Sequence, residues 1–241
     1  MDEMRISEYL HSLEPDGSDF LESLRAFAKE NDVPIVRRET ESFLRTMCVL
    51  KKPETILEIG TAIAYSTTVF AEYCDSVVTL ENYEKRIALA KENIRALGNE
   101  DRITLKCGDA GESLKELSAE GRKFDMIFLD AAKGQYLTWL PDIKKLMEEG
   151  SVLIADNVLQ DNTVMESRYT VARRDRTTHE RMREFLYQIK HDPSLQTSIL
   201  PVGDGVSLSV MQKTARVDCG ARRPGDACYA PTGAERRVCV L

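Results

Sequence analysis

Acidic and amide side chains follow several short apolar runs of the chain, and these side chains are well suited to chemistry. Asp130 comes directly after the run Met126–Leu129, and Asp156 and Asn157 come directly after Val152–Ala155. Two carboxylates and one amide oxygen are a donor set that hard divalent cations such as Mg2+ prefer. Like charges at neighbouring strand ends would otherwise repel one another and lose solvation. The sequence therefore predicts a metal site.

Lys133 stands three residues after Asp130 and is a candidate general base. Beside a bound cation the ammonium form of a lysine is disfavoured, so the amine can accept a proton from a substrate. One alternative needs no metal. In it, one carboxylate caps a helix and the other pairs with Lys133.

A glycine turn and a later carboxylate have the character of a nucleotide site. Gly60 ends the run Thr55–Ile59, and a glycine there lets the backbone approach a ligand closely. Glu81 follows about 20 residues later, where a carboxylate can bind ribose hydroxyls. Asp109 and Ala110 would lie beside an adenine ring. For Glu81 and Asp109, helix capping is the alternative. The turn contains neither G-x-G-x-x-G nor G-x-x-x-x-G-K, which excludes the usual dinucleotide and phosphate loops.

Strand-length runs alternate with helical patterns between residues 55 and 155, which favours a parallel sheet covered on both faces. The expected strands are Thr55–Ile59, Val77–Leu80, Ile103–Lys106, Met126–Leu129 and Val152–Ala155. The expected helices between and after them are Ser66–Tyr73, Tyr83–Leu97, Gly111–Glu120 and Leu137–Glu148. Because ligands bind beyond the carboxyl ends of such strands, the polar residues should converge on one site.

The two ends of this region complete the predicted fold. Helical patterns fill the first fifty residues, a helix is expected at Thr177–Lys190, and a hairpin joins Ser194–Leu200 to Val206–Met211. We therefore expect an α/β, Rossmann-like fold. It has a seven-stranded, mostly parallel sheet with helices on both faces, an antiparallel last strand and N-terminal helices.

The composition is that of a globular protein, with 241 residues, 42% hydrophobic residues and a net charge of -7. Residues 1–213 are predicted to form one domain, and the Gly-, Pro- and Arg-rich residues 214–241 are predicted to be a disordered C-terminal tail. No run has the length of a membrane span and the acidic N-terminus lacks the features of a secretory signal, so a cytoplasmic protein without membrane contact is expected.

Several motifs together resemble the class I metal-dependent O-methyltransferases, which include the catechol and caffeoyl-CoA enzymes. They are ILEIGTAIAYS, the acidic end of the second strand, FLDAAKG and ADN. The family usually has Gly where this chain has Ala64. The stretch VPIVRRETESFL, with ESR and RRDR further on, looks closer to a bacterial branch that methylates 5-hydroxyuridine at the tRNA wobble position to give 5-methoxyuridine.

The resemblance implies two cofactors, S-adenosyl-L-methionine and Mg2+, and a homodimer. The implied contacts to S-adenosylmethionine are Val36, Glu58, Gly60, Thr61, Ser66, Glu81, Asp109, Ala110 and Asp130. The implied metal ligands are Asp130, Asp156 and Asn157. Catalysis would fall to Asp130 and to Lys133, which takes the proton.

The acceptor is predicted from a basic segment, Arg168–Arg183, which holds six Arg and two acidic residues in an otherwise acidic chain. Clustered Arg is typical of contact with a nucleic-acid backbone, and an exposed helix face paired with neighbouring acids is the alternative. The resemblance implies that a tRNA anticodon loop is the partner. The predicted RNA-binding residues are Arg37, Arg38, Arg168, Arg173, Arg174 and Arg176. Two alternatives stay open: methylation of small catechols or phenolic compounds, and a non-catalytic RNA-binding protein.

Overall fold

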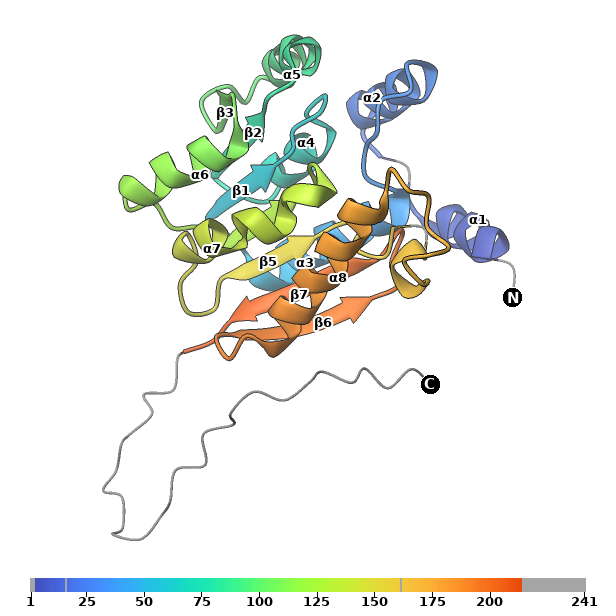
Figure 1. Cartoon of the computed structure of the whole chain (residues 1–241). Coiled ribbons are helices and arrows are strands. Elements are labelled where there is room, and N and C mark those ends of the chain that lie inside the picture. Colours follow the sequence, from blue (N-terminus) through green and yellow to red (C-terminus); the bar gives the residue numbers. More distant parts are fainter. Residues whose placement is uncertain (1–2, 16, 161, 214–241) are drawn as a thin grey trace, which may run out of the picture.

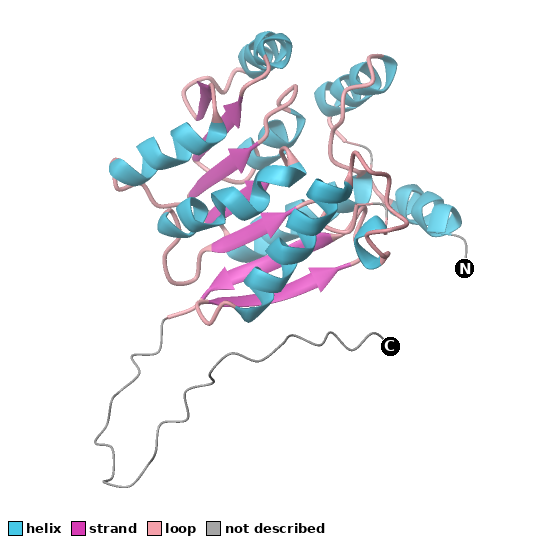
Figure 2. Cartoon of the chain, in the orientation of Figure 1, coloured by secondary structure: helices cyan, strands magenta, loops and turns pink. Residues whose placement is uncertain are grey.

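A seven-stranded sheet forms the centre of the molecule, with helices on both of its faces (Figure 1; Figure 2). The computed structural model describes residues 3–15, 17–160 and 162–213. The strands are β1 (Thr55–Ile59), β2 (Ser76–Glu81), β3 (Ile103–Cys107), β4 (Met126–Leu129), β5 (Val152–Ala155), β6 (Leu195–Leu200) and β7 (Val206–Met211).

Helices precede the sheet and alternate with its strands. They are α1 (Glu3–Leu13), α2 (Asp19–Glu30), α3 (Arg38–Lys51), α4 (Tyr65–Ala71), α5 (Glu84–Leu97), α6 (Ala110–Ala119), α7 (Tyr136–Lys145) and α8 (Arg176–His191), with short 3-10 helices η1 (Lys133–Gln135) and η2 (Thr163–Met165). Among the helices of the described ranges, none combines the length and the apolar character that crossing a membrane requires.

The strand order β3-β2-β1-β4-β5-β7-β6 places the first strand near the centre of the sheet. β1 pairs in parallel with β2 on one side and with β4 on the other, so the chain changes direction across the sheet between these two neighbours. β7 lies antiparallel between β5 and β6. In such sheets the crevice at this reversal, at the carboxyl ends of the strands, is the usual ligand site.

Alternation along β4 shows how the sequence builds two cores. Met126 and Phe128 face one apolar cluster, which includes residues of α2, α3, α4 and α5. Ile127 and Leu129 face the other, which includes residues of α6, α7 and α8. Since successive side chains of a strand point to opposite faces, a run that is buried on both sides must be apolar throughout.

The expected fold class is confirmed, because all seven expected strands are present and the last is antiparallel. The helix bounds differ most at α7, which ends at Lys145, three residues before the predicted end. The carbonyl of Leu146 accepts a bond from the backbone N–H of Phe124 ahead of β4. Residues 214–241, which were predicted to form a tail, lie outside the described part of the chain.

Candidate active site

A cavity of about 520 Å3 opens at the carboxyl ends of β1, β2, β4 and β5. Most of the predicted site residues line it. They are Val36, Arg37, Gly60, Thr61, Ser66, Glu81, Ala110, Asp130, Lys133, Asp156 and Asn157. The strand ends thus bring together residues that are more than 120 positions apart in the chain.

Gly60 is required by a neighbouring part of the protein itself. Its φ is +107°, and a Cβ added there would lie 2.0 Å from the carbonyl oxygen of Asp130. At the same place the N–H of Asp130 donates to the carbonyl of Ile59 at 3.0 Å, which joins the end of β4 to the end of β1. Any other residue at position 60 would push the end of β1 away from the end of β4, where the predicted catalytic residues begin.

The turn after Gly60 is strained. Ala62 and Ala64 have φ values of +48° and +65°, and Ala64 precedes α4 without a side-chain cap. The left-handed conformation costs an L-residue about 1–2 kcal/mol. This cost is offset by bonds to the turn. The N–H of Ala62 donates to Glu81 Oε2 at 2.8 Å, and Asn93 Nδ2 donates to the carbonyl of Ile63 at 2.8 Å.

Glu81 links two turns of the cavity wall. Besides the bond from Ala62, its Oε1 accepts from the N–H groups of Asn82 and Tyr83, each at 3.0 Å. A carboxylate has about four acceptor positions, so these three bonds leave capacity for a ligand hydroxyl. Glu81 therefore holds the loop before α5 and also faces the cavity.

Glu58 lies beneath the cavity rather than on its wall. It is fully buried in the middle of β1, where its Oε2 accepts bonds from the hydroxyls of Thr67 and Thr79. Burial raises the pKa of Glu58 to about 7, because these bonds only partly offset the lost solvation. Its Oε1 is buried without a hydrogen-bond partner among the described residues. An unpaired buried carboxylate oxygen fits a cavity that receives a cationic ligand.

Asp130 and Asp156 lie at the ends of β4 and β5. Leu129 and Ala155 are paired in the sheet, so Asp130 and Asp156 leave it side by side. The pKa of Asp156 is raised to about 7, first by burial and then by the charge of Asp130. Lys133 Nζ donates to Asp130 Oδ1 at 2.9 Å. This pair is the one that the metal-free alternative predicts. Asp156 Oδ1 accepts from the N–H of Asn157 at 2.8 Å, but among the described residues Asp156 forms no ion pair.

The donor set fits a hard divalent cation. The carboxylates come from Asp130 and Asp156, and Asn157, which follows with φ +54°, supplies an amide on the same cavity wall. The described ranges contain no group of three His, Cys, Asp or Glu side chains that could hold a metal ion, so this site depends on two carboxylates and one amide. A cation here would neutralise the negative charge that now raises the pKa of Asp156.

Tyr136 is fully buried in the core and supports this acidic end. Its buried hydroxyl donates to the carbonyl of Leu129 at 3.0 Å and lies 3.3 Å from the carbonyl of Asp156. It therefore ties the end of β4 to the end of β5. Burial raises the pKa of its phenol, and the charges of Asp130 and Asp156 raise it further.

Two predicted cofactor and RNA residues have other contacts. Asp109 caps α6 by accepting a bond from the N–H of Glu112 at 3.0 Å, which is the capping alternative, while its neighbour Ala110 lines the cavity. Arg38 pairs with Glu22 of α2 at 2.9 Å and does not line the cavity. The cap of Asp109 is the alternative that the sequence offered, whereas the pair of Arg38 with Glu22 depends on how α2 packs against α3.

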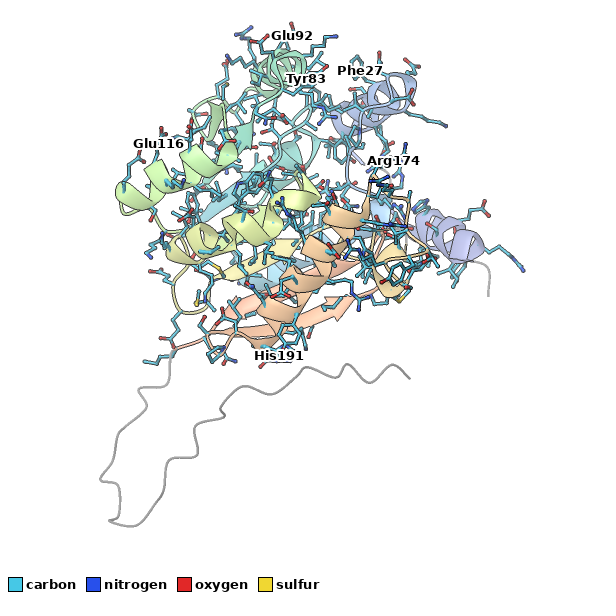
Figure 3. The ribbon with its side chains drawn as sticks, viewed as in Figure 1. Phe27, Tyr83, Glu92, Glu116, Arg174 and His191 are labelled. Carbon is cyan, nitrogen blue, oxygen red and sulfur yellow. The ribbon has the colours of Figure 1, made fainter. Side chains whose placement is uncertain are left out.

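The basic segment does not line the cavity but borders it, since Arg181 Nη1 donates to the carbonyl of Gly134, next to the lining residue Lys133, at 3.0 Å. Arg168 pairs with Glu180 at 2.6 Å, Arg174 with Asp175 at 3.4 Å, and Arg176 Nε donates to the carbonyl of Val171 at 3.2 Å. Figure 3 places Arg174 at the tip of the loop that leads into α8. The two acidic residues of the segment, Asp175 and Glu180, therefore each pair with one of its six Arg side chains.

Arg86 and Trp139 also line the cavity, and the sequence alone did not identify Arg86. Arg86 is on the first turn of α5, five residues after Glu81. No residue pattern marks it, because its place depends on the direction in which α5 leaves β2.

A family model described as O-methyltransferase matches residues 11–212. The chain belongs to the O-methyltransferase family. It is 34% identical over 132 residues to a catechol O-methyltransferase of Niastella koreensis, an alignment that covers 53% of this chain and 60% of that protein.

Solved structures agree with this assignment. A Staphylococcus aureus structure, provisionally described as a caffeoyl-CoA O-methyltransferase, shares 31% identity and a TM-score of 0.79 and covers 85% of this chain and 98% of its own. A Bacillus cereus O-methyltransferase in complex with SAH shares 27% identity and a TM-score of 0.77 and covers 86% and 97%. The chain is an S-adenosylmethionine-dependent O-methyltransferase with the fold of these proteins.

Proposed function

We propose that this methyltransferase transfers a methyl group from S-adenosylmethionine to a hydroxyl of a small catechol-type compound, with a divalent cation at Asp130, Asp156 and Asn157. The observation that carries the proposal is the acidic pair beside Lys133, at the end of the cavity that fits a cationic ligand. The names of the relatives support a catechol or caffeoyl acceptor. A catechol presents two oxygens on adjacent carbons, which suits binding to one cation.

The proposed work of the cofactor end is positioning. Glu81 holds the ribose, Gly60, Thr61 and Ser66 surround the methionine end, and Val36 closes over it. The sulfonium supplies an activated methyl group, so the protein needs no covalent intermediate. Holding the methyl carbon in line with the acceptor oxygen can contribute ~7–11 kcal/mol. Glu58, buried below, supplies negative charge under the cationic donor.

The proposed work of the acceptor end is deprotonation. A phenolic hydroxyl is a poor nucleophile, and its oxyanion is a good one. A divalent cation in this site would stabilise the oxyanion. Lys133 Nζ, 2.9 Å from Asp130 Oδ1, would take the proton as a neutral amine, which requires that a bound cation rather than the lysine ammonium neutralises Asp130. The anionic oxygen and the cationic sulfonium then neutralise each other during transfer, which a dry cavity favours.

The direct test is methylation of catechol and of caffeic acid by the purified chain with S-adenosylmethionine and Mg2+. The proposal expects a methoxy product by mass spectrometry and its loss when EDTA is added. Product formation that is equal with and without EDTA would contradict the metal, and no product from either acceptor would contradict the acceptor class.

The positive charge of the basic segment Arg168–Arg183 favours a second acceptor. Arg173 and Arg174 are exposed on one loop, and Arg is typical of phosphate contact. In 5-hydroxyuridine the hydroxyl lies beside a carbonyl oxygen, so this base also offers two adjacent oxygens to a cation. The tRNA wobble position, methylated to 5-methoxyuridine, is therefore the second candidate.

Incubation with tRNA that carries 5-hydroxyuridine separates the two acceptors. If tRNA is the acceptor, 5-methoxyuridine forms, and Arg173→Glu with Arg174→Glu weakens tRNA binding and flattens its salt dependence. The same double variant leaves catechol methylation unchanged if the acceptor is small. The homodimer and the cytoplasmic location stay predictions.

A further inference from the structure

Tyr65 connects the cofactor cavity to the helices that precede the sheet. It is the first residue of α4, it lines the cavity, and its side chain is buried. Its hydroxyl oxygen lies 2.7 Å from Glu41 Oε2 of α3 and 2.6 Å from Arg25 Nη2 of α2. We call Arg25, Glu41 and Tyr65 the helix clamp.

Every pair within the helix clamp is in contact. Arg25 Nη2 donates to Glu41 Oε2 at 2.6 Å, and its guanidinium carbon lies 4.7 Å from the centre of the Tyr65 ring. Glu41 also accepts a bond from Arg45 Nε at 3.0 Å, and Arg45 pairs with Glu72 just beyond α4. Charge-assisted bonds of this kind are stronger than neutral ones. They join α2 and α3 to α4 at a single phenol.

Arg25 bonds to both other members of the helix clamp through Nη2, but one of its other donors has no partner in the part of the chain that the structure describes. Its Nε is buried without a hydrogen-bond partner among the described residues. A buried donor without an acceptor destabilises a fold. The bonds to Tyr65 and Glu41 thus hold the guanidinium in this position although its Nε stays unpaired within the described ranges.

The clamp lies next to the strained turn of the cavity wall. Ala62 and Ala64 are left-handed, and Ala64 directly precedes Tyr65 without a side-chain cap. Alanine resists this conformation. Thr61 and Ser66, on either side of the turn, line the cavity. A shift of Tyr65 would therefore release the turn and move groups that face the cofactor.

We propose that Arg25 and Glu41 are positioning residues for the cofactor, which act through Tyr65 to hold the Ala62–Ala64 turn in the conformation that receives S-adenosylmethionine. This goes beyond the proposed acceptor chemistry and requires only that the chain binds its methyl donor. Because the donor binds the ordered turn, a clamp that raises the population of this form lowers the apparent Kd by the same factor.

The test measures binding of S-adenosylhomocysteine to the full chain by calorimetry. Tyr65→Phe removes one hydroxyl, and Arg25→Met removes the charge while keeping most of the length. Each should weaken binding about five- to tenfold, because the ordered turn becomes a minor form. At saturating S-adenosylmethionine, kcat should stay within about twofold, because the ordered population is restored by mass action.

Glu22→Gln is the matched control. It breaks the 2.9 Å ion pair between Glu22 and Arg38, which also joins α2 to α3 but makes no bond to Tyr65. Its Kd should equal that of the wild type. In the Tyr65→Phe background, Ala64→Gly should restore most of the affinity, because glycine adopts the left-handed turn without strain.

An unchanged Kd in both clamp variants would overturn the proposal. Equal weakening in Glu22→Gln would also overturn it, since the effect would then reflect general helix packing. Tyr65→Phe keeps the buried ring, so the test stands even if Arg25→Met does not fold.

Discussion

Two carboxylates at the cofactor cavity, Glu58 and Asp156, and the carboxylate of the helix clamp, Glu41, carry opposite pKa shifts, and the first two are also more completely buried than Glu41. Burial raises the pKa of both Glu58 and Asp156 to about 7. Burial also acts on Glu41, but bonds from Tyr65 and Arg45 and the charges of Arg25 and Arg45 outweigh it, so its pKa is lowered. The difference lies in the partners that the chain provides.

This contrast separates structural charges from those that serve a ligand. In the helix clamp, arginines of the same chain neutralise the carboxylate, and the folded protein is complete without a ligand. In the cavity, the fold keeps buried negative charge with too few cations. A cationic sulfonium and a divalent cation would supply what is missing, so the imbalance is itself an indication of function.

The largest effect is expected at the metal end. Asp156→Ala removes a proposed ligand, and losing several kcal/mol of oxyanion stabilisation should lower methyl transfer by on the order of 10^3. Binding of S-adenosylhomocysteine should stay within about threefold, because none of the proposed cofactor contacts comes from β5 or from the residues that follow it. Asp142→Asn, which breaks a surface pair with Lys145, is the control. Full activity in Asp156→Ala would show that this carboxylate serves only the fold.

Lys133→Met is expected to have the next largest effect. Loss of a general base typically lowers kcat by about 10^2–10^4, and the lower end is expected where the acceptor is already acidic. The KM for S-adenosylmethionine should not change. Lys115→Met, on the exposed face of α6, serves as the control. If the KM for the acceptor rises and kcat is preserved, Lys133 binds the acceptor and does not remove its proton.

Glu58→Gln sharpens the contrast through pH. Since the folded pKa of Glu58 is raised to about 7, its contribution to stability is complete below its ordinary pKa and is lost as the pH rises through 7. The wild type should therefore lose stability relative to Glu58→Gln between these values, by on the order of 5 °C in Tm. Thermal melts of both proteins across this range measure the gap, and a gap independent of pH would contradict the raised pKa.

Glu41→Gln should show the opposite and smallest trend. Its folded pKa is lowered, so its contribution is present above its ordinary pKa and is lost as the pH falls through the folded value. The Tm of the variant should lie about 2–4 °C below that of the wild type at pH 7, with the gap closing in acid. A gap that widens in acid would mean that Arg25 and Arg45 do not neutralise this carboxylate.

The sequence predicts the convergence of Asp130 and Asp156 because both follow runs that are expected to form parallel strands, whose carboxyl ends meet at one edge of the sheet. The close approach of Gly60 to the carbonyl oxygen of Asp130 could not be predicted, because Asp130 follows another strand of the sheet. The link from Arg25 to Tyr65 spans 40 residues and follows from the packing of α2 against α4. Periodicity predicts elements and their ends, whereas side-chain partners depend on how these elements pack.

The central claim is that the fold holds one divalent cation at Asp130, Asp156 and Asn157. Titration with Mn2+, followed by electron paramagnetic resonance in the presence of S-adenosylhomocysteine, tests it without any acceptor. We expect one bound ion per chain in the wild type and none in Asp130→Ala or Asp156→Ala. Absence of stoichiometric binding in the wild type, or equal binding in both variants, would contradict it.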